Sequence, residues 1–329
     1  MNRLMWAAAA AGLGGLLLPL AATAQASPAT AQVDALEGLF GKQPTFRRSQ
    51  AKGVCASGYF TGRALSSASV FSGDKVPVVA RFSVGGGNPK ASDKSRSVRG
   101  MALQFTLPDN ELWQSASISA PMYFVSKPEQ FAQFLVVRTP DPATGKPDSE
   151  KLKAFNEANP ETLLQGAYLA KAPIPASYGA ASYWSTNAFE FVNARGEGKF
   201  GRWQFEPAAG ALGLTEEQLK TLPDDFLADE LRNRVAAAPV AFEFKVQIAE
   251  KEDQLTDPTR VWPEGRAVVS AGKLVIDSVE PAAGGACDKI TFIPLVLPKG
   301  IKPSADPVLL ARPAPYGVSL GRRLTEAPK

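Results

Sequence analysis

Short apolar runs, separated by glycines and polar turns, recur along most of this 329-residue chain. The runs are rich in Val, Phe and Tyr, which are residue types that favour β-strands. They occupy residues 53–60, 76–84, 101–107 and 122–125 in the first half, and residues 184–192, 199–206, 240–249 and 268–280 in the second. Because strand follows strand with few long helical interruptions, this pattern predicts an antiparallel sheet.

Helical signals are confined to a few segments. Apolar residues recur at helical spacing after Pro128, across residues 149–159, and across residues 215–235 with Thr215 as a cap. A last helix is predicted to begin near Pro313, because a proline in a first turn lacks only an N–H that would have no intrahelical partner. Strands with segregated helices favour an α+β domain with a curled or barrel-like antiparallel sheet over an alternating doubly wound fold.

The N-terminus reads as a secretory signal. Arg3 precedes an apolar run over residues 7–20, and small residues follow at residues 22–26. A membrane anchor is the alternative, but the run is shorter than the roughly 18–20 residues that a span needs. We therefore expect a signal peptide over residues 1–26, a mature chain beginning at Gln25 or Ser27, one domain over residues 27–329, no membrane span after cleavage, and a periplasmic or secreted location.

The composition excludes several classes of chemistry. The chain contains no histidine, so it has no Ser-His-Asp or Cys-His nucleophile and no histidine-ligated metal. Its net charge of +4 falls to +3 without Arg3, and a positive charge this small does not predict nucleic-acid binding. Cys55 and Cys287 form no CxxC pattern, which excludes a thioredoxin motif and covalent haem attachment. In an oxidising compartment they can pair, and two inert buried thiols are the alternative.

One pair of residues near the C-terminus suggests a chemical site. Arg312 and Tyr316 are one helical turn apart, so a guanidinium and a phenol oxygen can share a helix face. A surface arginine beside a buried tyrosine would show the same spacing. The order of other segments along the chain strengthens the functional interpretation: a basic segment, an RFS strand, an APMYF segment, and then this pair followed by Arg323.

These segments together resemble the haem-dependent catalase superfamily, and more closely its short exported branch, the catalase-related peroxidases. The resemblance covers about residues 40–324, and its most specific parts are QAKGVCASGYF (50–60), VPVVARFSVGGG (76–87), SVRGMALQF (97–105), APMYFV (120–125) and the RPAPY and GRR segments of the tail. It implies a barrel-like antiparallel catalase core with surrounding helices, a haem b cofactor, and peroxide with a small organic electron donor as substrates. It also implies a monomer or small homo-oligomer.

The resemblance assigns roles to individual residues. Tyr316 matches the axial ligand of the haem iron, and Arg312 matches the cation that stabilises its phenolate. Ser83 matches the serine that holds the catalytic imidazole on the distal side. Tyr123 matches an aromatic ring on the porphyrin, although plain core packing is an equal alternative. Three residues match arginines that bind the haem propionates: Arg47, Arg81 and Arg323.

The chain departs from the family pattern at the distal base. Gln50 occupies the histidine position and Ile118 the position of a distal asparagine. An amide can orient peroxide but cannot shuttle its proton, so we expect a weak haem peroxidase. Two alternatives are a non-catalytic haem carrier or sensor with a catalase-like fold, and a barrel-like binding module without haem. The chain ends six residues after Arg323, so we expect no C-terminal helical domain and no NADPH.

Overall fold

The computed structural model describes residues 26–326. Within these residues, eight antiparallel strands form a closed barrel in the order β1-β2-β3-β4-β5-β7-β8-β9, and β9 pairs with β1. Strands β6 and β10 extend the sheet from β7. The prediction of an α+β fold with a barrel-like antiparallel sheet is confirmed. The strands are β1 (Gly53–Gly62), β2 (Lys75–Val84), β3 (Arg99–Thr106), β4 (Leu112–Ile118), β5 (Tyr183–Trp184), β6 (Phe189–Val192), β7 (Gly198–Pro207), β8 (Val240–Ile248), β9 (Val268–Pro281) and β10 (Ile301–Pro303).

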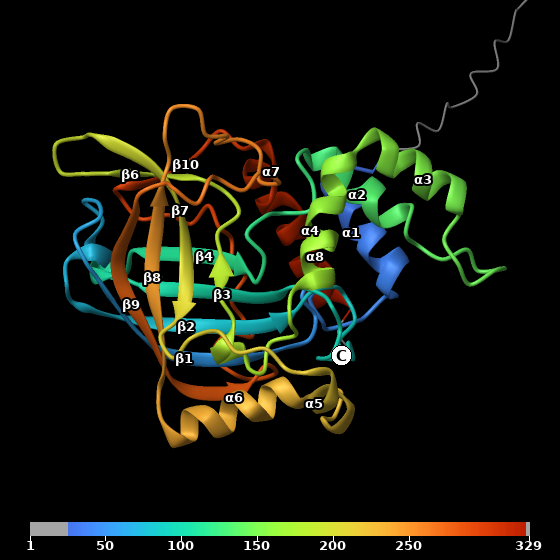
Figure 1. Cartoon of the computed structure of the whole chain (residues 1–329), viewed down its shortest axis with the longest axis horizontal. Helices are drawn as coiled ribbons and strands as arrows, with labels where there is room; N and C mark the ends of the chain where they lie inside the picture. Colours follow the sequence, from blue (N-terminus) through green and yellow to red (C-terminus); the bar gives the residue numbers. More distant parts are fainter. Residues whose placement is uncertain (1–25, 327–329) are drawn as a thin grey trace, which may run out of the picture.

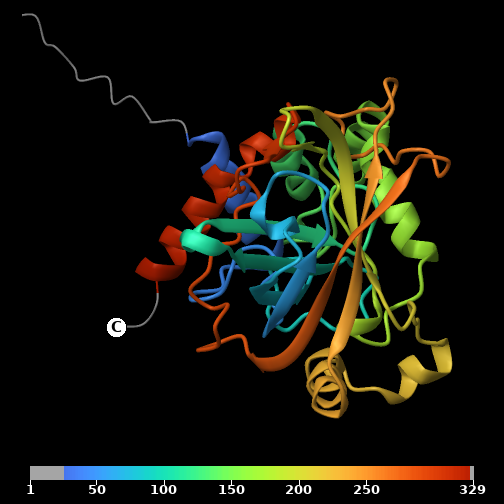
Figure 2. The same cartoon turned by 90° about the vertical axis from the view of Figure 1, so that its left-hand side faces the viewer.

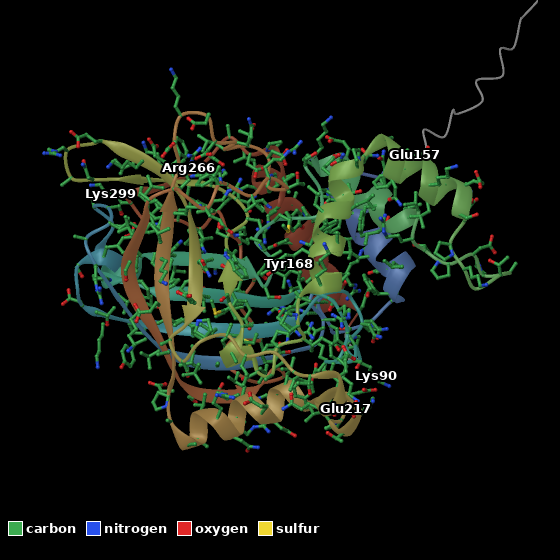
Figure 3. The ribbon with its side chains drawn as sticks, in the orientation of Figure 1. Lys90, Glu157, Tyr168, Glu217, Arg266 and Lys299 are labelled. Carbon is green, nitrogen blue, oxygen red and sulfur yellow. A yellow bond between two sulfur atoms is a disulfide. The ribbon has the colours of Figure 1, made fainter. Side chains whose placement is uncertain are left out.

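Most helices lie on one flank of the barrel. Figure 1 shows α1 to α4 and α8 gathered on the right, with α5 and α6 below the barrel. Figure 2 shows α8, in red, running along the side of the barrel, and α1 contacts both α2 and α8. The helices are α1 (Pro28–Phe40), α2 (Pro128–Val136), α3 (Ser149–Ala158), α4 (Leu164–Lys171), α5 (Glu216–Thr221), α6 (Phe226–Ala237), α7 (Pro307–Ala311) and α8 (Pro313–Thr325). In Figure 3, Glu157 marks this helical flank and Lys299 the opposite end of the molecule.

The barrel interior is the hydrophobic core. Phe60, Trp113, Trp203 and Phe244 are almost fully buried there and meet mostly edge to face or tilted. Each such side chain contributes on the order of 1.5–3 kcal/mol by leaving water. Since successive side chains of a strand point to opposite faces, the same strands that fill the core also present a second set of residues outside the barrel.

Three sequence-based assignments differ from the structure. Residues 122–125 are not a strand: the N–H of Tyr123 donates to the Pro258 carbonyl, and the segment connects β4 to α2. The predicted strand over residues 184–192 divides into β5 and β6, separated by a polar turn. The predicted helical stretch 215–235 is two helices, because Pro223 lies in the break between α5 and α6.

Other local predictions are confirmed, and some elements were missed. Thr215 caps α5 by accepting from the Gln218 N–H, and the Gln218 side chain accepts in return from the Thr215 N–H. Helix α8 begins at Pro313, as predicted.

Strand β4 was missed because its polar residues, in the sequence LWQSASI, conceal the alternation of apolar and polar side chains. Helices α1 and α4 were also missed. The predicted signal peptide lies almost wholly outside the described residues.

Candidate functional site

A deep cavity lies between the outer face of the barrel and helices α1, α2 and α8. It encloses about 1410 Å³ of empty space, part of it open to solvent. Its barrel wall comes from β2, β3 and β4, and α1 and α8 supply much of the rest. Every residue assigned a role from the sequence lines this cavity, together with Ile118: Arg47, Gln50, Arg81, Ser83, Tyr123, Arg312, Tyr316 and Arg323. The structure therefore brings together residues that are spread over most of the chain.

Strand alternation explains how β2 serves both the core and the cavity. Val78, Ala80 and Phe82 point into the barrel and belong to its core. Arg81 and Ser83 alternate with them and point outward to the cavity. Strand β2 is thus buried on both faces, which explains why its sequence is apolar along most of its length.

On one side of the cavity, Arg312 and Tyr316 form the predicted pair. The Arg312 side chain donates two hydrogen bonds to the Tyr316 hydroxyl oxygen, from Nε at 2.9 Å and from Nη2 at 2.5 Å. Burial acts to lower the pKa of Arg312, but the neighbouring Tyr316 and Tyr123 oxygens outweigh it and raise that pKa. The two N–H donors hold the Tyr316 oxygen in place where it faces the cavity.

Two further polar residues, Asn187 and Asp306, support this pair, and the sequence analysis did not identify them. Arg312 also lies 3.5 Å from the Asn187 side-chain oxygen, and the Asn187 amide donates to Asp306 at 2.7 Å. Asp306 is completely buried and caps α7, and burial raises its pKa. The polar triplet Ser185-Thr186-Asn187, inside an otherwise apolar run, was the available signal.

The other three arginines form an array at the cavity edge. Arg47 donates to the carbonyl oxygens of Cys287, Asp288 and Ile290, and Arg323 donates to that of Asp288. Burial lowers the pKa of Arg47 to about 9, with repulsion from Arg81 and Arg323 as a further cause. Burial likewise lowers the pKa of Arg81 to about 10. Asp288 is the acidic partner within this array, and it lies 3.9 Å from Arg323 and is half exposed. The array therefore has a surplus of positive charge and suits a ligand with carboxylates.

The opposite wall of the cavity carries Gln50 and Ser83. The Ser83 hydroxyl donates to the Gln50 side-chain oxygen at 2.5 Å. Gln50 has a backbone φ of 55°, in the left-handed region that glutamine seldom adopts. A Cβ at Gly100 would lie 2.2 Å from this Gln50 oxygen and 2.7 Å from the Ser83 hydroxyl, so the pair fits only because position 100 is glycine. Among the described residues that line the cavity there is no Asp, Glu or His, so none of them is an ordinary base near neutral pH.

Tyr123 and Ile118 complete this region. Tyr123 lies in the connection before α2, and its ring centroid is 4.6 Å from that of Phe124. Burial raises the pKa of Tyr123, so its hydroxyl is protonated at neutral pH. Ile118 pairs with Gly100 across β3 and β4 and gives the cavity an apolar surface next to Gln50.

Helix α1, which sequence analysis missed, closes one side of the cavity. Gln32, Val33 and Leu36 line it from this helix. Ion pairs hold α1 in place: Glu37 accepts from Arg48 at 2.5 Å and from Arg322 of α8 at 2.8 Å. Arg48 is almost fully buried and also pairs with Glu326. The helix is therefore tied to both the segment before β1 and the C-terminal helix.

A disulfide links the two cysteines, Cys55 and Cys287, across 232 residues. Sequence reasoning left this pairing open.

Among residues 26–326, none of the helices has the length and apolar character that a membrane span requires.

Comparisons with known proteins agree with the fold. The sequence profile of the catalase family matches residues 42–327. Two similar proteins are the catalase-related peroxidases of Synechococcus elongatus, 41% identical over 88% of this chain and 87% of that protein, and of Mycolicibacterium paratuberculosis, 35% identical over 88% of this chain and 93% of that protein.

The longer catalases share the fold over part of their length. Catalase A from Saccharomyces cerevisiae superposes with a TM-score of 0.76 at 23% identity, over 86% of this chain and 62% of that one. A fungal catalase gives the same TM-score and identity, over 60% of its own length. This chain thus spans about three fifths of these catalase chains. The profile match over most of the chain and the 41% identity to a relative of similar extent show that the chain belongs to the catalase family.

Proposed function

We propose that this chain is an exported haem peroxidase that oxidises a small organic donor with peroxide, slowly because it lacks a distal base. The observation that carries the proposal is the arrangement around one cavity of a tyrosine held by a buried arginine, opposite a glutamine in the usual histidine position. Export is proposed because residues 1–26 have the pattern of a secretory signal.

The cavity residues fit a haem. The arginine array of Arg47, Arg81 and Arg323 has more positive charge than its neighbours neutralise, which suits two propionates. Apolar side chains such as Val33, Ile118 and Phe131 line the walls, which suits a porphyrin face. The Tyr316 oxygen faces the cavity and is the type of ligand that binds iron in catalases. A bound haem would supply an iron centre that reacts with peroxide.

The Tyr316 side of the cavity would then bind the iron, and the Gln50 side would bind peroxide. Arg312 positions the Tyr316 oxygen to bind iron by donating two hydrogen bonds to it. Ser83 orients Gln50 by donating to its carbonyl oxygen, which leaves the Gln50 amide N–H groups to donate to a peroxide in the cavity. Gln50 cannot accept the peroxide proton, so deprotonation must occur in solution or through water. Turnover is expected to be slow for this reason.

Replacing Tyr316 with phenylalanine tests the haem site directly. The wild-type protein, loaded with haem, is expected to show a Soret band typical of tyrosinate ligation and to oxidise a donor faster than free haemin. Tyr316→Phe removes one oxygen and should abolish that spectrum while circular dichroism stays unchanged. If the loaded wild-type protein oxidises no donor with any peroxide faster than free haemin, the peroxidase proposal is wrong.

A haem carrier or sensor is the second candidate. The absence of Asp, Glu and His from the described cavity lining favours it, because binding requires no base. Transfer of haem from the loaded protein to apomyoglobin, without measurable turnover, would support this function over the peroxidase.

A further inference from the structure

The segment that follows β9 holds two of the three arginines of the array. We call residues 282–290 the cradle loop. Arg47 donates to three carbonyl oxygens in it, those of Cys287 at 3.0 Å, Asp288 at 3.1 Å and Ile290 at 2.8 Å. Arg323 donates to the Asp288 carbonyl at 3.2 Å. The positions of these two guanidinium groups thus depend on the position of the loop.

The disulfide attaches this loop to the strand pair that carries the third arginine. Cys287 belongs to the cradle loop, and Cys55 belongs to β1; both are completely buried. In the antiparallel register of β1 and β2, Cys55 lies directly opposite Arg81. The disulfide therefore joins the loop whose carbonyl groups orient Arg47 and Arg323 to β1, the strand that pairs with the one bearing Arg81.

The loop packs closely around this bond. A Cβ at Gly285 would lie 2.3 Å from the Pro281 carbonyl and 3.0 Å from Cys55 Sγ, so the chain approaches the disulfide as closely as glycine permits. Apart from short turns, the loop has no regular secondary structure that would hold it in place. Hydrogen bonds from the Gly284 and Ala286 N–H groups to the Asp288 and Glu280 side chains restrain the loop locally, and the disulfide adds a covalent restraint that ties it to the barrel.

Electrostatic repulsion between the arginines of the array makes a restraint on the loop necessary. Arg81 and Arg323 lie close enough to Arg47 to lower its pKa by repulsion. Asp288 offsets only part of the positive charge of the three arginines. Like charges that face a cavity tend to separate when no anion is bound. A loop free to shift would carry Arg47 and Arg323 away from Arg81.

We propose that the Cys55–Cys287 disulfide positions Arg47, Arg81 and Arg323 as a preformed site for the two carboxylates of a haem. This inference rests on the proposed haem-binding function. Preorganisation of this kind raises affinity, because binding does not have to order the groups that make the contacts. Both cysteines act through the arginines and touch no reacting atom.

The test compares two ligands that differ only in their carboxylates. Wild type and the Cys55→Ala/Cys287→Ala variant are titrated with haem and with haem dimethyl ester, and binding is followed at the Soret band. We expect the variant to bind haem about tenfold more weakly than wild type, which corresponds to the loss of one charge-assisted hydrogen bond. Its affinity for the dimethyl ester should stay close to that of wild type.

A variant destabilised elsewhere serves as the matched control. Leu231 is completely buried on α6, outside the cavity lining, and Leu231→Ala weakens the fold without touching the arginine array. It should retain the preference for haem over the ester. If the cysteine pair variant does not fold, Cys55→Val combined with Cys287→Ala restores buried volume for the same titrations.

The outcomes separate the inference from the proposed function. Unchanged haem affinity in the cysteine variant, or an equal loss for haem and its ester, would overturn the positioning role. Failure of wild type to bind haem at all would instead overturn the proposed function and, with it, the basis of this inference. Selective loss of haem affinity supports both.

Discussion

Replacing Gln50 with histidine should restore a proton acceptor to the cavity. The backbone at this position has φ of 55°, and histidine is one of the residues that tolerate left-handed geometry. Ser83 lies 2.5 Å from the Gln50 oxygen, and its hydroxyl can accept as well as donate. It can therefore accept an N–H from the imidazole and leave the other ring nitrogen free as a base. A positioned base contributes about 10²–10⁴ in rate, or about 2.7–5.5 kcal/mol of transition-state stabilisation.

The assay is steady-state kcat/KM for hydrogen peroxide with a fixed donor, measured from pH 5 to 8. Gln50→His should raise kcat/KM by at least about tenfold at pH 7, a conservative share of that range. It should also introduce an inflection near the ordinary histidine pKa of about 6.5. Gln50→Leu is the control, because it removes the amide without adding a base, and it should be no faster than wild type. Equal rates for Gln50→His and wild type would refute the assignment of the defect to position 50 and direct attention to Ile118.

The remaining predictions concern the supports of the cavity. Burial raises the pKa of Glu37, but hydrogen bonds from Arg48 and Arg322 outweigh it and lower that pKa below its ordinary value. The stabilisation from Glu37 is therefore present above the ordinary carboxyl pKa and is lost as the pH falls through the lowered pKa. Glu37→Gln should cost about 1–3 kcal/mol at pH 7 by urea denaturation, and its difference from wild type should shrink as the pH falls through the lowered pKa. Gly100→Ala places a methyl group against the Gln50 oxygen and should lower stability by about 1–3 kcal/mol. Gly166→Ala is the control, because a Cβ has open space there; since Gly166 lies in α4, this change should raise stability by up to about 1 kcal/mol. Equal urea midpoints for the two glycine variants would contradict the close packing at Gly100.

Local patterns predicted those parts of the fold that depend on local interactions. The capping box at Thr215 and the start of α8 at Pro313 involve only neighbouring residues, so the sequence displays them. Strand β4 and helix α1 were missed because their burial depends on distant partners. The polar residues of β4 are covered by other parts of the chain, and α1 is held by Arg322 of α8, far from it in sequence.

The candidate site shows the same division. The resemblance to the catalase family identified the cavity residues but not Asn187 and Asp306. The polar triplet at Asn187 and the Asp-Pro start of α7 are local signals, but only the folded chain shows that Asn187 lies beside Arg312 and links it to Asp306. The strand assigned to residues 122–125 was wrong because an apolar, aromatic segment has the same composition whether it pairs with another strand or packs as a connection.

The sequence alone therefore determined the strand-rich α+β class and the absence of histidine chemistry, since residue types and their order are local facts. Tertiary structure decided that eight strands close into a barrel, that the cysteines pair, and that Arg47, Arg81 and Arg323 form one array beside that disulfide. These features depend on contacts between residues more than 200 positions apart, and only the folded chain brings such residues to within a few ångströms of one another.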